Sequence, residues 1–267
     1  MCIRDSLRRF IPDRLAYFLI RIRNISFQQF FFKRARAYPE QAKERILNMV
    51  KEELPEDIVN KHFTPSYNPW DQRICLIPNS DFFESIKAKT SSVVTDHIEK
   101  FEEKGIRLKS GNFLPADLIV TATGLILESF GGVKMSVDNK PIEASDTYTY
   151  RSLMYSGIPN LVSCFGYINA SWTLKADLTS EYVCRLIKHM KKNDFEVVCP
   201  QFEVDIEESD DFLNGFSSGY IKRAADSQPK QGKEKPWINL QDYFKDWIDI
   251  KFKKLDDGYL NFSKLEK

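Results

Sequence analysis

The sequence predicts an α/β fold, in which helices pack on an open sheet of strands. Leu118–Val120 is an unbroken run of β-favouring apolar residues, which is typical of a central strand buried on both faces. Leu161–Phe165 predicts a second buried strand. Thr173–Met190 predicts the clearest helix, and Ser171 or Thr173 can cap it. The apolar residues that share one face of this helix are Leu178, Tyr182, Val183, Leu186, Ile187 and Met190.

The end of the first predicted strand has the features of a ligand crevice. Gly124 allows a sharp backbone turn there, and the small side chains up to Thr123 let a flat ligand come close. Open α/β sheets bind their ligands at the carboxyl ends of strands. An ordinary strand end can carry the same residues, so these residues alone leave both interpretations open.

The composition gives the chain no strong global charge. The 267 residues carry a formal net charge of +1, so no general attraction to nucleic acid is expected. The hydrophobic content of 42% is enough for one large core or two modest ones. No apolar run approaches the roughly 20 residues that a membrane-spanning helix needs. The expected setting is the cytoplasm.

The cysteines and histidines predict neither disulfides nor a metal site. The five cysteines are odd in number and contain no CxxC pair, so we expect buried, reduced thiols. No histidine stands at ligand spacing from a cysteine or carboxylate. The residues are Cys2, Cys75, Cys164, Cys184 and Cys199, with His62, His97 and His189.

The first 53 residues predict two or three amphipathic helices over Leu7–Glu53. This region has twelve Lys or Arg against six Asp or Glu, a net charge of +6. Phenylalanines lie among the bases, and such a helix can lie on a membrane surface or guide an anionic cofactor. A helical insertion whose aromatic face packs on a core gives the same pattern. The phenylalanines are Phe27, Phe30, Phe31 and Phe32.

The remaining segments alternate between short elements and loops. In the first half these are a packed loop over His62–Pro78, a helix over Asp81–Lys89 capped by Asn79 or Ser80, a strand over Ser92–Thr95, and short strands within His97–Leu114. In the second half they are a hairpin over Val133–Ile142 about Asp138-Asn139, a mobile connection over Asp226–Lys235, and an amphipathic segment over Trp237–Phe252.

Three segments, taken in this order, resemble the C-terminal half of the flavin-containing monooxygenases, closest to the Baeyer–Villiger group. They are Tyr67–Pro78, Asp117–Leu125 and Ile158–Thr173, and the resemblance runs from about Leu7 to Met190. It implies a flavoprotein with two dinucleotide-binding domains that uses FAD and NADPH. The implied reaction inserts one oxygen atom of O2 into a ketone, or onto a sulfur centre, through a peroxyflavin.

The chain also departs from that family. Its members carry two GxGxxG turns and an FxGxxxHxxxW fingerprint between them, but no two glycines here stand two apart and the fingerprint is absent. The resemblance therefore implies the end of the NADP domain with a helical insertion over residues 1–124. Residues 125–267 are the C-terminal part of the FAD domain. The opening Met1–Ser6 is unlike the family and is interpreted as a scar of sequence assembly.

The resemblance implies a role for one arginine and one turn. Arg73 matches an active-site arginine above the flavin, where a permanently charged planar donor stabilises negative oxygen; a structural ion pair with Asp71 is the alternative. The turn before the predicted helix, with Asn169, Ser171, Trp172 and Thr173, matches one whose helix N-terminus faces the flavin ring; a plain capped helix is the alternative. Thr123 and Gly124 match the strand end beside the cofactor.

Two other function classes remain open from the sequence. Flavin-dependent disulfide reductases share the two-domain plan, but they need a redox-active cysteine pair that this sequence lacks. A non-enzymatic module that binds membrane surfaces through residues 7–53 would show lipid binding without flavin dependence.

Overall fold

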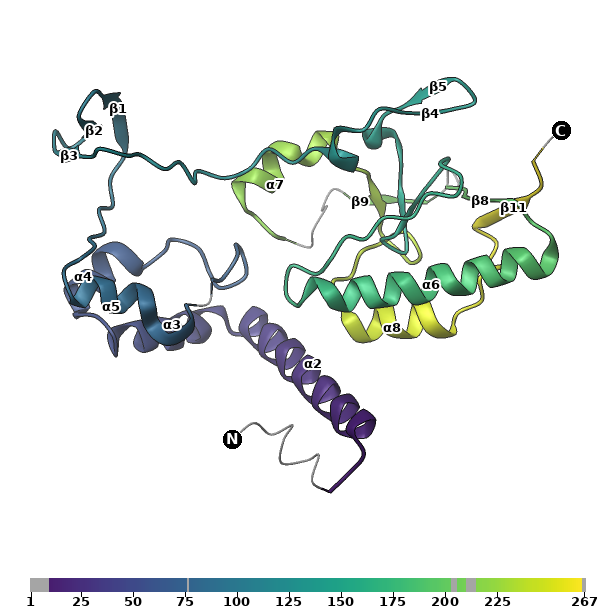
Figure 1. Cartoon of the computed structure of the whole chain (residues 1–267), viewed down its shortest axis with the longest axis horizontal. Helices are drawn as coiled ribbons and strands as arrows, with labels where there is room; N and C mark the ends of the chain where they lie inside the picture. The colour runs from purple at the N-terminus through teal and green to yellow at the C-terminus, as the bar shows by residue number, and fades with distance from the viewer. Residues whose placement is uncertain (1–9, 76, 203–205, 210–214, 266–267) are drawn as a thin grey trace. The chain divides into compact units, whose positions relative to one another are not determined.

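The computed structural model describes residues 10–75, 77–202, 206–209 and 215–265. The chain divides into two compact units (Figure 1). The larger unit comprises residues 1–33 and 126–267, and the smaller unit comprises residues 34–125. The expectations for Cys2 and for the opening Met1–Ser6 lie outside the described residues. The assignment of residues 1–124 and 125–267 to two cofactor domains stays a prediction.

Helices open the smaller unit, as the periodicity predicts. Their bounds are α3 Pro39–Lys51, α4 Glu56–Ile58, the π-helical turn η1 Val59–Phe63, the 3-10 turn η2 Pro78–Ser80 and α5 Asp81–Lys87. The predicted cap of α5 is wrong. Ser80 is at the N-cap position with φ 58°, but its hydroxyl donates to the Glu53 carboxylate at 2.8 Å instead of capping the helix.

An antiparallel three-stranded sheet completes the smaller unit and confirms the short strands predicted within His97–Leu114. Its strands are β1 Ile98–Glu102, β2 Gly105–Leu108 and β3 Phe113–Pro115, in the order β1-β2-β3. Gly105 has φ 150°, and a β-carbon there would overlap the Leu114 carbonyl. The close β2–β3 approach therefore requires glycine at this position.

Two predicted strands of the smaller unit are not strands in the structure. Ser92–Thr95 and Leu118–Val120 are extended but join no sheet among the described residues, and the side chains of Leu118 and Val120 are 81% and 80% exposed. A strand needs a neighbour for its backbone hydrogen bonds, and no described segment pairs with either one. The local pattern is that of a strand, but no partner strand lies among the described residues.

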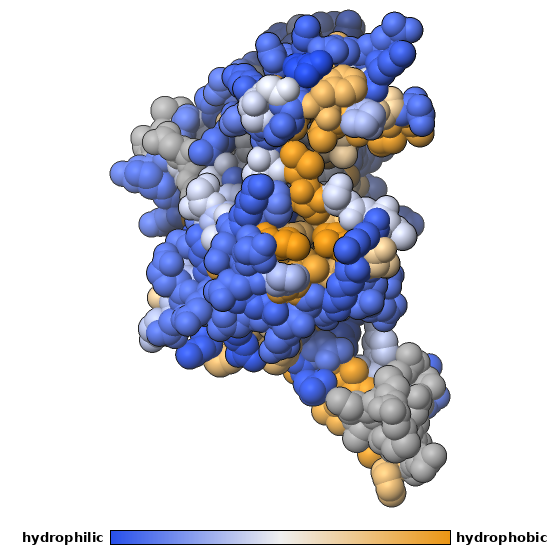
Figure 2. Space-filling model, turned by 90° about the vertical axis from the view of Figure 1, so that its left-hand side faces the viewer, coloured by the Kyte–Doolittle hydropathy of each residue, from blue (hydrophilic) through white to orange (hydrophobic). Residues whose placement is uncertain are grey.

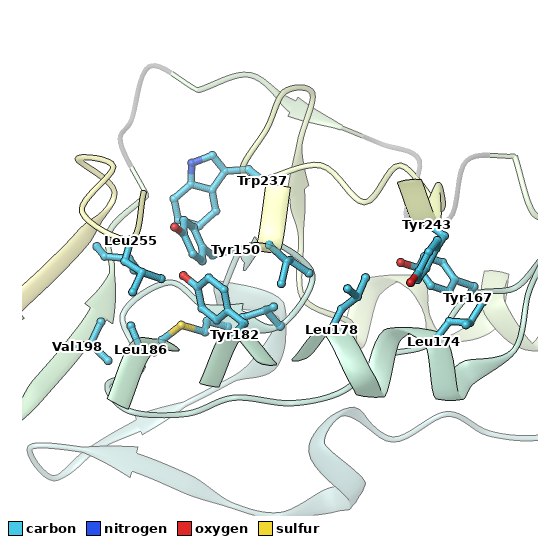
Figure 3. Close-up of a cluster of buried hydrophobic side chains, with 14 of the residues drawn as sticks. Tyr150, Tyr167, Leu174, Leu178, Tyr182, Leu186, Val198, Trp237, Tyr243 and Leu255 are labelled. Atoms are coloured by element: carbon cyan, nitrogen blue, oxygen red, sulfur yellow. The ribbon is translucent and has the colours of Figure 1, made fainter. Parts of the chain in front are cut away.

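The core of the larger unit lies between α6 (Trp172–Asn193) and α8 (Tyr243–Phe252). The two helices lie side by side (Figure 1), and Tyr150, Tyr182 and Trp237 pack between them and the strands (Figure 3). Helix α6 confirms the predicted helix over Thr173–Met190. Of its predicted apolar face, Leu178, Tyr182 and Leu186 are buried, whereas Ile187 is exposed.

Short elements surround this core. They are η3 Ser129–Gly132, the hairpin β4 Met135–Val137 and β5 Lys140–Ile142, η4 Ala144–Asp146, the pair β6 Thr149–Tyr150 and β7 Met154–Tyr155, the pair β8 Val197–Pro200 and β11 Leu260–Ser263, the pair β9 Glu208–Ser209 and β10 Gln231–Gly232, α7 Gly219–Ala224 and η5 Ala225–Ser227. The β4–β5 hairpin confirms the prediction for Val133–Ile142. Asp138 and Asn139 both have positive φ there, as a tight two-residue turn demands.

Two predictions for the larger unit are wrong. Leu161–Phe165 forms no ladder among the described strands, although the Ser163 amide donates to the Leu153 carbonyl at 2.8 Å. The Asp226–Lys235 segment is anchored rather than a mobile connection. Gln231 is buried within the β9–β10 pair, and Thr149 donates to the Lys230 carbonyl. The polar composition of this segment did not indicate these contacts, because the partners lie elsewhere in the sequence.

Helix α2 (Asp13–Ala37) confirms the predicted helical start. Ile25 is buried in the core of the larger unit, whereas Phe27 and Phe30 are 67% and 64% exposed. Phe27 and Phe30 therefore do not pack on a core in this structure, whereas Phe31 and Phe32 are partly buried. Apolar patches also interrupt the hydrophilic surface on the face shown in Figure 2. No helix within the described ranges is long and apolar enough to cross a membrane.

Gln29 on α2 gives the first testable prediction. Its side chain is only 4% exposed, and neither its amide nitrogen nor its amide oxygen has a hydrogen-bond partner among the described residues. Because an unsatisfied buried polar group costs about 1–3 kcal/mol, Gln29→Leu is expected to raise the free energy of unfolding by about 1 kcal/mol. Urea unfolding measures it, with the exposed neighbour Gln28→Leu as the control. A loss of stability in Gln29→Leu would show that the amide is satisfied in solution.

Candidate flavin-facing site

The loop before α6 is held by one residue far away in sequence. The Ile168 amide donates to the Gln241 side-chain oxygen at 2.8 Å, and the Asn169 side-chain amide donates to the Gln241 carbonyl at 2.8 Å. Asn169 is only 8% exposed, yet its Oδ1 has no hydrogen-bond partner among the described residues. A buried acceptor without a donor indicates a site for a donor from outside the chain.

The start of α6 leaves its backbone amides without a side-chain cap. Ser171 holds the N-cap position at φ −63° and ψ 134°, but no side-chain capping bond is formed. The Ser171 and Thr173 hydroxyls instead bond to each other at 2.8 Å. The predicted capping by Ser171 or Thr173 is therefore wrong. An uncapped helix N-terminus carries about half a positive charge and free amide donors, which favour an electron-rich ligand.

Trp172 forms a partly exposed wall beside this helix start. Its ring lies 5.5 Å from that of Phe165, measured between centroids, and about half of the side chain is exposed. A β-carbon at Gly166 would overlap the Trp172 ring, so only glycine fits there. Gly166 was not among the predicted site residues, although an isolated glycine directly after a predicted strand was the signal that could have revealed it.

A cavity of about 270 Å³ adjoins the start of α6 within the larger unit. Its lining includes Ser171 and Leu174 from α6 and Arg21 from α2. Burial acts to lower the pKa of Arg21, but hydrogen bonds with Tyr17 and Asp177 hold that pKa above its usual value. The same cavity is thus bordered by a permanent positive charge and by a helix N-terminus. Both favour binding of the negatively polarised edge of a ligand.

Buried ion pairs fix α6 against α8. The Lys175 ammonium, one turn into α6, lies 2.9 Å from the Asp246 carboxylate, which also accepts from the Tyr167 hydroxyl at 2.9 Å. Arg151 lies 2.6 Å from Asp249 in the same core. These charges are nearly fully buried, and the Lys175–Asp246 pair joins the first turn of α6 to α8. No local sequence pattern predicts these pairs, because the partners are separated by 70 residues or more.

The other predicted site residues lie in the smaller unit. Arg73 is exposed in a stretch without regular structure, and within the described ranges it forms no ion pair. Asp71 pairs with Arg36 instead, at 2.7 Å, so the alternative ion pair of Arg73 with Asp71 is not formed. Thr123 and Gly124 are also exposed, and Gly124 has φ 113°, a conformation that only glycine adopts readily. The structure gives no direct test of their predicted roles.

The predicted burial of the cysteines is wrong. Three of the described cysteines are exposed and the fourth is half-buried, and none of these four forms a disulfide; they are Cys75, Cys164, Cys184 and Cys199. The prediction that no two cysteines form a close redox pair is based on the sequence alone. Within the described ranges, no group of three or more His, Cys, Asp or Glu side chains could hold a metal ion.

Comparison with known proteins identifies relatives along almost the whole chain. Over 262 residues the chain is 44% identical to the probable FAD-binding monooxygenase AlmA of Acinetobacter sp. It is 43% identical over 263 residues to the FAD-containing monooxygenase EthA of Mycolicibacterium smegmatis, and 40% identical over 261 residues to the putative FAD-containing monooxygenase MymA of Mycobacterium tuberculosis. The chain belongs to the flavin monooxygenase family. No family model and no solved structure match it.

The match covers 98% of this chain but only 53% of each of these relatives. This member of the flavin monooxygenase family thus spans about half the length of its curated relatives. Two of its features fit the ring of an FAD: the unpartnered Asn169 Oδ1 and the uncapped start of α6. Neither of them binds a pyrophosphate, and no GxGxxG turn is present in the sequence.

Proposed function

We propose that this chain is the flavin-facing half of an FAD- and NADPH-dependent monooxygenase. The proposed reaction inserts one oxygen atom of O2 into a ketone, in the Baeyer–Villiger manner, or adds it to a sulfur centre. The observation that carries the proposal is the uncapped start of α6 beside the unpartnered Asn169 Oδ1, in a chain that is 44% identical to an FAD-binding monooxygenase. The cytoplasm, which supplies NADPH and keeps thiols reduced, is the proposed setting.

The α6 N-terminus holds the pyrimidine edge of the FAD ring in this proposal. The backbone amides at the start of α6 would hold that edge, and the partial positive charge of the helix would favour the reduced, anionic ring. Asn169 Oδ1, a buried side-chain acceptor without a partner among the described residues, would accept a hydrogen bond from a ring N–H. Trp172 limits how far the ring can slide, because it is braced by Phe165.

Arg73 stabilises negative charge on oxygen in the same proposal. Bound FAD supplies the activation of O2, and the attack on a carbonyl places a negative charge on the substrate oxygen. The exposed guanidinium of Arg73, with no carboxylate partner among the described residues, is free to donate to that oxygen. Thr123 and Gly124 let the cofactor approach the backbone, and residues 1–124 and 125–267 belong to the NADP and FAD domains respectively.

A second candidate function rests on the exposed aromatic residues of α2. Phe27 and Phe30 are more than 60% exposed, and Arg23 and Arg34 flank them in sequence. Exposed aromatic and basic side chains on one helix favour contact with an anionic membrane surface. This candidate predicts binding to anionic vesicles in the absence of any flavin, and it is compatible with the monooxygenase proposal.

A chimera tests the proposed activity. This chain is joined to the half of AlmA that it does not match, and the product is supplied with FAD, NADPH, a ketone or a thioether, and isotopically labelled O2. Mass spectrometry is expected to find one labelled oxygen atom per product molecule. The 267-residue chain alone is expected neither to hold FAD nor to oxidise NADPH. A folded, FAD-loaded chimera that transfers no oxygen to either substrate class would reject the proposed reaction.

A further inference from the structure

Gln241 is a buried glutamine whose side-chain donor is left open. The residue is only 4% exposed, and its Nε2 has no hydrogen-bond partner among the described residues. Its backbone also lies in the left-handed region, at φ 50°, which residues with a β-carbon adopt only at a cost in free energy. Both features destabilise the fold, which favours a role for this side chain in binding rather than in packing.

The hydrogen bonds around Gln241 fix which of its two side-chain atoms is open. Gln241 Oε1 accepts from the Ile168 amide at 2.8 Å, so turning the side-chain amide over would set two donors against each other. Asn169 is fixed in the same manner, because its Nδ2 donates to the Gln241 carbonyl at 2.8 Å. The open atoms are therefore a donor, Gln241 Nε2, and an acceptor, Asn169 Oδ1. They do not pair with each other, since each amide is already held through its other atom.

The loop before α8 holds Gln241 in place. Its backbone amide donates to Asn239 Oδ1 at 3.2 Å. The next residue, Asp242, caps α8 by accepting from the Phe244 and Lys245 amides. A donor that the fold has already immobilised loses little conformational entropy when it binds a ligand. Gln241 is thus preorganised next to the loop that leads into α6.

We propose that Gln241 is a cofactor-binding residue, and that Gln241 Nε2 and Asn169 Oδ1 together bind the imide edge of the FAD ring. In an imide an N–H stands between two carbonyl groups, so its recognition needs one acceptor and two donors. Asn169 supplies the acceptor, Gln241 supplies one donor, and the uncapped amides at the start of α6 supply the other. Gln241 lies in none of the three segments that resemble the family. The inference rests on the FAD part of the proposed function, not on oxygen transfer.

Gln241→Glu in the FAD-loaded chimera tests the donor. The carboxylate keeps an oxygen for the Ile168 amide but has no N–H, so a role limited to bracing the loop predicts no change. We expect the dissociation constant of oxidised FAD, from fluorescence titration, to rise by about tenfold or more. Isotope-edited infrared spectroscopy should show a ring-carbonyl stretch at higher wavenumber, because that carbonyl loses a hydrogen bond. An unchanged carbonyl frequency in a folded Gln241→Glu chimera overturns the proposal, whatever the affinity.

Gln228→Glu is the matched control. Gln228 Nε2 is also buried and unpartnered among the described residues, but within that part of the chain the residue has no hydrogen bond to the loop before α6. The control should therefore change neither the affinity for FAD nor the carbonyl frequency. A carbonyl shift of equal size in Gln228→Glu would show that the effect is not specific to Gln241 and would overturn the proposal.

A modified cofactor tests the acceptor without changing the protein. FAD that is methylated at the imide nitrogen has no N–H to donate to Asn169 Oδ1. The unmodified chimera should bind it about tenfold more weakly than FAD, or more weakly still. Equal affinity for the two cofactors would show that this edge is not bound by the pair, which overturns the proposal.

The other outcomes separate this inference from the proposed function. A chimera in which Gln241→Glu shifts the carbonyl stretch, but which transfers no oxygen, would reject the proposed reaction and leave this inference standing. Normal oxygen transfer with an unchanged carbonyl stretch would do the reverse. A higher KM for NADPH at unchanged affinity for FAD would indicate that the pair binds the nicotinamide carboxamide, which overturns the inference. If the chimera does not fold, AlmA that carries only this chain's residues 158–252 takes its place with the same variants.

Discussion

Arg73→Ala is expected to separate the two halves of the proposed reaction in the chimera. Reduction of FAD by NADPH builds no negative charge on the substrate oxygen, so it should largely persist. Loss of one preorganised donor to a developing oxyanion costs about 3–4 kcal/mol, a slowing of oxygen transfer by about a hundredfold to a thousandfold. NADPH should then be consumed with the electrons released as hydrogen peroxide. Stopped-flow kinetics resolves the two half-reactions.

Two further variants complete this test. Arg73→Lys should recover little oxygen transfer, because a compact ammonium does not reproduce a planar fork of donors. Arg36→Ala is the matched control, since Arg36 is a second arginine of the smaller unit whose partner, Asp71, is known; it should leave both half-reactions near the original rates. Full yield of oxygenated product from Arg73→Ala would mean that this arginine has no catalytic role.

Asp246→Ala is expected to destabilise the larger unit by about 3–5 kcal/mol. The substitution leaves the Lys175 ammonium, which is 1% exposed, without its carboxylate, and an uncompensated buried charge is among the most costly defects in a core. The Tyr167 hydroxyl loses its acceptor as well. Urea unfolding of the 267-residue chain, followed through the fluorescence of the buried Trp237, measures the loss.

A surface pair provides the control for the buried one. Lys251 and Glu181 lie 2.9 Å apart with both side chains partly exposed, so Glu181→Ala should cost less than about 1 kcal/mol. Replacing both buried partners, as Lys175→Met with Asp246→Leu, should recover most of the stability lost by Asp246→Ala. If Asp246→Ala costs no more than Glu181→Ala, the Lys175–Asp246 pair does not fix α6 in solution.

The sequence predicted the elements that form through local interactions. Helix α6 follows from apolar residues at helical spacing, and the β4–β5 hairpin follows from Asp138 and Asn139, which tolerate positive φ. The strands predicted at Leu118–Val120 and Leu161–Phe165 do not form, because strands depend on pairing between separate segments of the chain. A strand exists only when another segment supplies its hydrogen bonds, and a run of β-favouring residues carries no information about whether that segment is present.

The candidate site divides in the same way. The start of α6 was predicted within one residue, because turn residues followed by an apolar periodic run mark a helix N-terminus. The absence of a side-chain cap was not predicted. It arises because the Ser171 hydroxyl forms a hydrogen bond with the Thr173 hydroxyl instead of with a backbone amide. Gln241, which holds Asn169 from 72 residues away, was missed because no local pattern marks such a contact.

The reduction potential of FAD bound to the chimera reports whether the α6 N-terminus faces the flavin. Ser171 has φ −63°, which proline adopts without strain. Ser171→Pro removes one amide donor from this terminus and should leave the fold intact. We expect a lower, more negative potential, because the anionic reduced ring loses a stabilising donor. An unchanged or higher potential in a folded, FAD-loaded Ser171→Pro chimera would contradict it.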